Sequence, residues 1–225
     1  MMSGMSTPDT STPRRREQQR SADTKQTILR TALKEFAERG FEAASMRAIA
    51  EQSGLTHQLI TYHFQSKEVL WQAVAMLVYE ELARAREGLI RQAKPATAIG
   101  QLRQEFIAYF QFTLDQPHLH RFMMQRREGT HSEDRQAWLA QHFLRPHFDL
   151  ARPLIKAAQK AGDLPRGEPV LLYYAMVSLA NTLAVMGPDI EATTGVQASA
   201  AKTAKAYMKV MDAMLFSRAG DNDVT

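Results

Sequence analysis

The chain has 225 residues, of which 44% are hydrophobic and 23% charged, so it is long and apolar enough to bury a substantial core. It contains no cysteine, which excludes disulfides, thiolate metal sites and cysteine nucleophiles. The net charge is only +4, but ten Lys and Arg residues against six Asp and Glu residues lie between Arg14 and Lys67, a concentration that favours a polyanionic partner.

Residues 1–22 are rich in Ser, Thr, Pro, Arg and Gln and show no hydrophobic periodicity. We expect a disordered basic tail there, and a solvated tail of this kind is the alternative explanation of the local positive charge. The segment has no apolar run, so we expect no signal peptide. Together with the lack of cysteine, this favours a cytoplasmic location.

The first helix is predicted to begin at Asp23, because Asp23 and Gln26 resemble a capping box, and to end at Gly40. Its buried face is indicated by apolar residues at helical spacing, namely Ile28, Leu29, Ala32, Leu33, Phe36 and Ala37.

Two short helices follow, the first capped by Ser45 and ended by Gly54, the second starting at Thr56. A fourth helix begins at Ser66 and continues to about Arg91. At 1.5 Å per residue it makes a rod of roughly 35–40 Å.

Beyond Pro95 every segment keeps a helical pattern, and no alternating strand pattern occurs. We predict helices over Pro95–Gln116, Pro117–Arg127, Ser132–Ala161, Glu168–Met186 and Gly195–Phe216, with breaks that include Gly187-Pro188. The chain is therefore expected to be all-α with about nine helices. We expect a three-helix domain over residues 23–68, a larger helical domain over residues 69–217, and a flexible tail over residues 218–225.

The two short helices have the pattern of a helix-turn-helix unit. Ala50 is small enough for a close helix crossing, Gly54 can adopt a left-handed turn without steric cost, and Ile60 packs inward. The second helix then presents outward His57, Gln58, Thr61 and Tyr62. Such side chains at the start of a helix suit the edges and phosphates of a major groove. The alternative is that they are simply exposed residues of a structural subdomain.

The stretch "MRAIAEQSGLTHQLITYHFQSKEVLW" resembles the DNA-binding signature of TetR/AcrR-type transcriptional regulators, and the resemblance extends over about residues 24–71. It implies a sequence-specific regulator, most simply a ligand-responsive repressor that binds a palindromic operator as a homodimer.

Carried over position by position, the resemblance implies a set of DNA contacts. The implied base readers are His57, Gln58, Leu59 and Thr61; the implied phosphate contacts are Ser45, Tyr62, His63 and Lys67, with Arg47 reaching either bases or phosphate and Thr56 capping a helix whose N-terminus favours a phosphate. Thr61 stands where the family often carries tyrosine, and Leu59 where a small or polar residue is frequent, so the operator sequence stays open.

The larger domain must bury many aromatic and methionine side chains, and for most of them a helical core is the simpler interpretation. The resemblance implies a cavity among the central helices for a small-molecule effector, which aromatic and methionine residues would make suitable for a hydrophobic or aromatic ligand. The candidates are Phe106, Tyr109, Phe110, Phe122, Met123, Arg126, His147 and Tyr174. Arg126 could hold an anionic group, although a surface charge is the simpler interpretation.

No metal, cofactor or catalytic residue is expected. Four histidines, His118, His120, His142 and His147, lack an acidic ligand at convincing spacing, so we expect them to be solvated or hydrogen-bonded. No nucleophile elbow, phosphate loop, zinc motif or dinucleotide fingerprint is present. An enzyme without a recognisable motif and a helical interaction module with a basic tail are the alternative functions.

The last two long helices carry small residues along apolar stripes, namely Ala175, Ser178, Leu179 and Ala184, then Ala200, Ala204, Met208, Met211 and Leu215. Small residues allow close helix approach, and the resemblance favours a homodimer interface there over internal packing. The apolar stretch Val170–Gly187 contains Ser178 and Asn181, and we interpret it as a buried helix, not a membrane span. Effector binding is expected to shift the fourth helix and so change the spacing of the two recognition helices.

Overall fold

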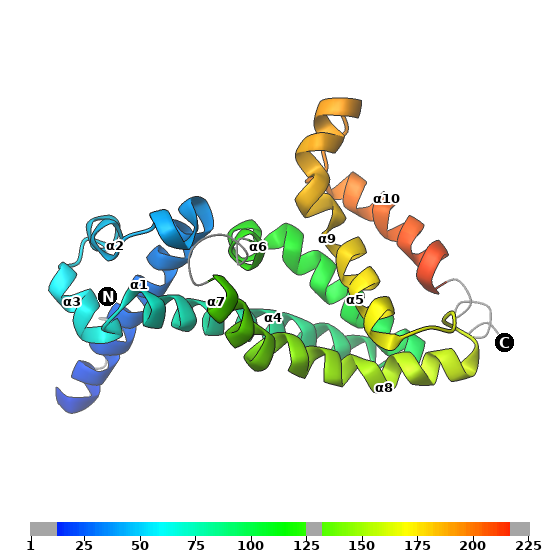
Figure 1. The fold of residues 1–225 in the computed structure, drawn as a ribbon, viewed down its shortest axis with the longest axis horizontal. Helices are drawn as coiled ribbons and strands as arrows, with labels where there is room; N and C mark the ends of the chain where they lie inside the picture. Colours follow the sequence, from blue (N-terminus) through cyan, green and yellow to red (C-terminus); the bar gives the residue numbers. More distant parts are fainter. Residues whose placement is uncertain (1–12, 125–131, 217–225) are drawn as a thin grey trace, which may run out of the picture.

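The computed structural model describes residues 13–124 and 132–216, and over these residues the chain is built from helices (Figure 1). In chain order they are α1 (Pro13–Ala43), α2 (Met46–Ser53), α3 (His57–Phe64), α4 (Lys67–Ala93), α5 (Ala98–Asp115), α6 (Pro117–Met124), α7 (Ser132–Leu139), the π-helical turn η2 (Ala140–Leu144), α8 (Arg145–Ala161), α9 (Pro169–Thr194), α10 (Ala201–Met211) and the π-helical turn η3 (Asp212–Phe216). No strand occurs among these described residues, which confirms the all-α class. Helix α7, η2 and α8 are continuous, and so are α10 and η3. The twelve elements of the described residues therefore form nine helical segments.

The first helix begins at Pro13, well before the predicted start at Asp23. Proline is tolerated in a first helical turn, and the Arg and Gln residues that follow are good helix formers. Asp23 lies inside the helix, where its Oδ1 accepts a hydrogen bond from Gln19 Nε2 at 2.8 Å, so it is not an N-cap. The prediction of a disordered tail is therefore wrong for residues 13–22. Residues 1–12 and 217–225 lie outside the described part of the chain.

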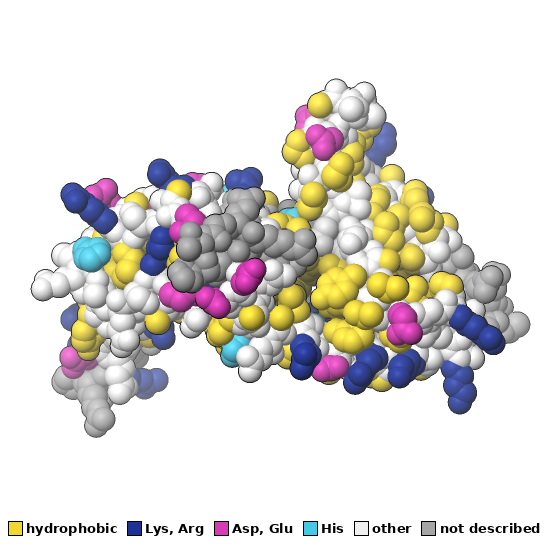
Figure 2. All heavy atoms as spheres, viewed as in Figure 1, with side chains coloured by type: hydrophobic (Ala, Val, Ile, Leu, Met, Phe, Trp, Pro, Cys, Tyr) yellow, Lys and Arg dark blue, Asp and Glu magenta, His cyan; other side chains and the backbone are white. Residues whose placement is uncertain are grey.

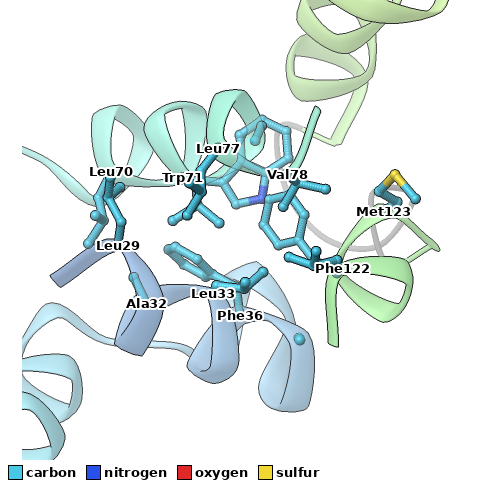
Figure 3. Close-up of a cluster of buried hydrophobic side chains, with 14 of the residues drawn as sticks. Leu29, Ala32, Leu33, Phe36, Leu70, Trp71, Leu77, Val78, Phe122 and Met123 are labelled. Atoms are coloured by element: carbon cyan, nitrogen blue, oxygen red, sulfur yellow. The ribbon is translucent and has the colours of Figure 1, made fainter. Parts of the chain in front are cut away.

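The first core cluster joins α1–α4 to α5, α6, α7 and η2, and Figure 3 shows the part of it that α1, α4 and α6 form. It contains Ile28, Phe36, Ile49, Ile60, Leu70, Trp71, Val78, Phe122 and Leu139, all nearly inaccessible to solvent. The Phe122 ring of α6 lies 5.6 Å from Trp71 and 6.3 Å from Phe36, measured between ring centroids. Burying one such side chain contributes about 1.5–3 kcal/mol, so α1–α3 are held firmly against the larger half of the chain.

Helix α4 connects the two halves of the molecule. It starts where the sequence predicts, and Ser66 caps it, with the Val69 N–H donating to Ser66 Oγ at 3.2 Å. Its 27 residues make a rod of about 40 Å at 1.5 Å per residue. It runs from the end that carries α2 and α3 to the far end of α5 and α8 (Figure 1).

The second core cluster joins α5, α8, α9, α10 and η3 around Phe106, Phe110 and Ile155. One of the predicted breaks differs from the structure here. Helix α9 continues through Gly187-Pro188 to Thr194. Gly187 is buried, and a Cβ at this position would lie 3.1 Å from Ala198 Cβ, so this glycine serves close packing and does not end the helix.

Helix α9 is also the one helix of the described residues that is long and apolar enough to cross a membrane, with a mean hydropathy of 1.6. Only 28% of its apolar window is buried, so the prediction of a buried helix holds for one side of α9 and not for the other. The exposed side carries Leu171, Tyr174, Val185 and Met186.

Candidate nucleic-acid interface

The turn between α2 and α3 is set by three local features. Ser45 Oγ accepts a hydrogen bond from the Ala48 N–H at 3.1 Å and starts α2. Gly54 ends it in the left-handed conformation, with φ 68° and ψ 20°. Thr56 Oγ1 then accepts from the Leu59 N–H at 3.2 Å and starts α3. The caps that the sequence predicts at Ser45, Gly54 and Thr56 are thus present.

Helix α3 is fixed by two buried residues and leaves the rest of its surface open. Ile60 is 0% and Phe64 2% exposed, and both belong to the first core cluster. The exposed residues of α3 are His57, Gln58, Thr61 and Tyr62, with Tyr62 at 79% exposure, while Leu59 and His63 are half-buried. His63 lies edge-on against Tyr62, with ring centroids 5.3 Å apart. The outward set is the one that the sequence predicts.

Thr61 differs from the other exposed residues of α3, because its hydroxyl has a hydrogen-bond partner within the helix. Thr61 Oγ1 donates to the His57 carbonyl at 3.0 Å, so its hydroxyl already has a local acceptor and offers its remaining lone pairs outward. His57, Gln58 and Tyr62 extend from the helix into solvent. Figure 2 shows histidine and basic side chains at this end of the molecule.

Arg47 lies on α2 and is highly exposed. Its Nε is 3.3 Å from Glu51 Oε1, one helical turn later, in a pair whose side chains are 84% and 69% exposed. Exposed pairs of this kind contribute at most about 1 kcal/mol, so Arg47 can exchange Glu51 for another anion at little cost.

The side chain of Lys67, which is predicted to contact a phosphate, is bound by backbone carbonyls of its own chain. Its Nζ donates to three backbone carbonyls, those of Phe41 at 2.9 Å, Glu42 at 3.2 Å and Ala44 at 3.1 Å. The ammonium group also lies 4.5 Å from the centroid of the Phe41 ring. A cation at the C-terminal end of α1 is favoured by the helix dipole, and this explains why a lysine begins α4.

Glu35 is a structural residue that the sequence analysis misses. It is 1% exposed, and its Oε2 accepts from Gln52 Nε2 at 2.7 Å and lies 3.4 Å from Arg39 Nε. This contact ties α1 to α2. The signal was available, because Glu35 lies three residues after Ala32 and so shares its buried face.

A second unpredicted cluster lies where α7 meets the end of α1 and the start of α4. Arg135 is 2% exposed, its guanidinium carbon lies 3.9 Å from the Phe41 ring centroid, and it pairs with Glu42 at 3.4 Å and Glu68 at 3.8 Å. Phe41 is therefore contacted by two cations, Lys67 and Arg135. A hollow of about 610 Å³ opens here, lined by Phe41, Glu42, Glu68, Gln72, Asp134, Arg135 and Trp138.

The residues predicted to line an effector cavity do not come together. Phe106 and Phe110 belong to the second core cluster and Phe122 and Met123 to the first, where Figure 3 shows the last two on α6. His147 lies beside Tyr79, and Tyr174 is 44% exposed on the outer side of α9. Arg126 lies outside the described residues. Core packing separates this set, because helical periodicity alone does not tell which core a residue enters.

Tyr109 is different, because it joins a buried polar network. Its hydroxyl donates to Asn181 Oδ1 at 3.1 Å, and His120 Nε2 lies 2.8 Å from the same oxygen. Asn181 Nδ2 donates to the Val177 carbonyl at 2.8 Å. His120 is 5% exposed, and burial lowers its pKa although the hydrogen bond of its ring to Asn181 opposes the shift. The network connects α5, α6 and α9 inside an apolar region.

Two further histidines bond to backbone carbonyls one helical turn earlier. His142 Nδ1 lies 2.7 Å from the Trp138 carbonyl, and His147 Nδ1 lies 2.7 Å from the Phe143 carbonyl. Among the residues that the structure describes, no group of three His, Asp or Glu side chains has the geometry of a metal site.

A further exposed surface is apolar. It combines Leu171, Tyr174, Val185 and Met186 of α9 with Val210 of α10 and Met214 of η3, and Figure 2 shows hydrophobic side chains gathered on this part of the molecule. The predicted stripe of the last helix is different: Ala204, Met208, Met211 and Leu215 pack on the second core cluster of their own chain. The exposed large apolar residues here are Val210 of α10 and Met214 of η3, each one position before a residue of the predicted stripe.

Comparisons with known proteins give sequence matches for the N-terminal part of the chain and a fold match over most of its length. Residues 28–74 match the family described as "Bacterial regulatory proteins, tetR family". The chain is 33% identical over 77 residues to the HTH-type transcriptional regulatory protein RaaS of Mycobacterium tuberculosis, a match that covers 34% of this chain and 36% of that one. It is 42% identical over 65 residues to the HTH-type transcriptional regulator UidR of Escherichia coli, covering 28% and 33%.

These matches span about a third of the length of the curated relatives. The likeness of fold extends further. A crystal structure of a bacterial regulatory protein in the tetR family from Rhodococcus superposes with a TM-score of 0.66 at 19% identity, covering 85% of this chain and 96% of that one. Sequence likeness is thus concentrated around α1–α4, whereas the helical architecture is shared over nearly the whole described chain.

Proposed function

Because the chain carries a DNA-binding domain of the tetR family and shares the fold of a solved member over most of its length, we propose that it regulates transcription by binding an operator in double-stranded DNA. It acts in the cytoplasm, most simply as a repressor whose DNA binding is released by a small effector. The DNA-binding head consists of α1–α3, and the larger helical half supplies dimerisation and effector binding.

The observation that carries this proposal is the exposed tip of α3. His57, Gln58 and Thr61 extend from the first turns of a helix whose opposite side is buried through Ile60 and Phe64. Gln can pair with the edge of adenine, and His and Thr can bond to bases or phosphates in a major groove. The N-terminus of the helix and Tyr62 favour the flanking phosphates.

The apolar surface of α9 and α10 supports a homodimer. Four large apolar side chains of α9 lie at helical spacing along one exposed stripe, with Leu171 68% exposed. Two such helices from each subunit would bury this surface in a four-helix interface. A twofold axis there places the two recognition helices on a palindromic operator, about one turn of DNA apart or a multiple of it.

The effector is proposed to bind between α5, α6 and α9. Tyr109, His120 and Asn181 place polar groups in an otherwise apolar region, which is the composition of a small-molecule site once the helices separate. Aromatic side chains from the second core cluster would surround a hydrophobic or aromatic ligand.

Two contacts can transmit an effector-induced shift to the head. Phe122 of α6 packs on Phe36 of α1, and Arg135 of α7 packs on Phe41, five residues further along α1. An effector that binds better to one arrangement of α6 and α7 changes the population of head positions that fit the operator.

The test is selection of bound sequences from a random duplex DNA pool by the intact chain. Recovery of a palindrome that His57→Ala/Gln58→Ala no longer selects would support specific reading through α3. The matched control is Gln111→Ala/His118→Ala, which removes an exposed Gln and an exposed His from α5 and α6. If the native chain enriches no sequence even at low salt, the regulator proposal fails.

A further inference from the structure

The first ten residues of α1 form a helix that packing does not explain. We call residues 13–22 the arginine arm. From residue 15 to residue 22 every side chain is exposed, and the first buried side chain of α1 is Ile28. A segment that is helical without entering either core cluster is not stabilised by burial. The reason for its sequence must therefore lie in what its exposed side chains can bind.

That surface is strongly basic. Arg15, Arg16 and Arg20 stand against a single carboxylate, Glu17, and the neighbouring residues are the neutral Gln18 and Gln19. Arg16 and Arg20 lie one turn apart and therefore share a face of the helix. Three guanidinium groups on an exposed helix suit a polyanion, because Arg forms directed hydrogen bonds with phosphate oxygens.

The position of the arm beside α3 indicates which polyanion it would bind. Lys25 Nζ lies 5.9 Å from the centroid of the Phe64 ring, and Phe64 is the last residue of α3. The arm therefore leaves the domain beside the recognition helix. Figure 1 shows it, in dark blue, extending past α3 at the same end of the molecule.

We propose that the arginine arm is an auxiliary DNA-binding element, which lies along the phosphate backbone next to the groove that α3 enters. This rests on the proposed function of α3. The arm is about 15 Å long, and duplex DNA carries one charge per about 1.7 Å of its axis, so several phosphates lie within reach. Backbone contacts of this kind add affinity without reading sequence.

The experiment compares the salt dependence of DNA binding by the intact chain and by Arg15→Gln/Arg16→Gln/Arg20→Gln. Gln has nearly the helix propensity of Arg, so the helix persists. The matched control, Lys156→Gln/Lys160→Gln/Arg166→Gln, removes three exposed cations from α8 and the segment after it. The probe is the selected duplex, together with a mixed-sequence duplex.

Each phosphate contact contributes about 0.9 to the slope of log affinity against log salt. One lost contact per arm in a dimer lowers that slope by about 1.8. Between about 50 and 200 mM salt the arm variant should therefore lose roughly tenfold less affinity than the native chain. The control variant should keep the native slope, and Arg15→Lys/Arg16→Lys/Arg20→Lys should restore it.

An arm variant with the native slope on both duplexes overturns the proposal, and so does a lysine variant that behaves like the glutamine variant. An altered sequence preference also overturns it, because the arm would then read bases. Failure of α3 as a reader is separate: the native chain would show no preferred duplex, while the slope on the mixed-sequence duplex would still measure the arm.

Discussion

Lys67 illustrates how a residue that is predicted to contact a phosphate can also hold the fold together. It begins α4 close to the recognition helix, but its ammonium group is directed at the end of α1. Three carbonyl acceptors and the face of Phe41 surround a charge that a phosphate would otherwise attract. We therefore expect Lys67 to affect DNA binding indirectly, through the geometry of the head.

Replacing Lys67 with Met should lower the free energy of unfolding by about 2–3 kcal/mol, because hydrogen bonds from a charged donor to three carbonyls are lost. Urea denaturation measures this. Lys156→Met removes an exposed lysine of α8 and should change the stability by less than about 0.5 kcal/mol. Equal stability of the native and Lys67→Met chains would return Lys67 to the set of phosphate contacts.

His120 makes the stability of the protein depend on pH. Burial lowers its pKa below the ordinary value of 6.5, so the folded state keeps the imidazole neutral where the unfolded state takes up a proton. The stabilisation by the neutral form is complete above pH 6.5 and is lost as the pH falls from 6.5 towards the folded pKa.

Thermal unfolding of the native chain and of His120→Gln should therefore diverge below about pH 6.5, with the native chain losing stability faster as the pH falls. The slope of the difference is at most about 1.4 kcal/mol per pH unit, that of one proton. Gln can still donate to Asn181 but does not titrate. Parallel curves from pH 7 to pH 5 would mean that His120 is not kept neutral by its surroundings.

At the scale of elements, the turn between α2 and α3 depends on conformation and not on space. Gly54 adopts φ 68°, and a Cβ added there would meet nothing within 4 Å. Any cost of a side chain at this position is therefore the cost of the left-handed backbone.

Gly54→Ala should lower the free energy of unfolding by about 1–2 kcal/mol, and Gly54→Asn by less, because Asn tolerates the left-handed region. Gly88 is the matched control, since a Cβ there also meets nothing within 4 Å but the residue lies inside α4. Gly88→Ala should raise stability by about 0.5–1 kcal/mol. Chemical denaturation of the three variants measures these effects, and the same sign at both glycines would contradict the argument.

At the scale of the whole molecule, the exposed stripe of α9 predicts an oligomeric state. Leu171→Asp/Met186→Asp should leave the monomer folded, because both side chains are largely exposed, but should prevent dimerisation by placing charges in an apolar interface. Sedimentation velocity measures the change. Val69→Asp/Met76→Asp, at two exposed apolar positions of α4, should remain dimeric. A monomeric native chain at micromolar concentration would contradict the interface.

Short-range sequence signals are enough to predict many of the helix ends and buried faces of this protein. The caps Ser45 and Thr56, the start of α4 at Ser66 and the turn at Gly54 each depend on residues within a few positions, and all occur where the sequence predicts them. The same holds for the buried side of α3, because Ile60 and Phe64 lie one turn apart. The exposed tip of α3 follows from these local rules, and so the candidate DNA-reading residues could be predicted.

The tertiary structure decides whatever depends on contacts between residues distant in the chain. Lys67 meets carbonyls more than twenty positions away, Arg135 meets Phe41, and Tyr109 shares Asn181 with His120. The division of the aromatic residues between two core clusters, and of the last helix between its buried and exposed sides, also needs the packed fold. Helical periodicity gives each helix a buried face, but only the packing of helices against one another determines what that face meets.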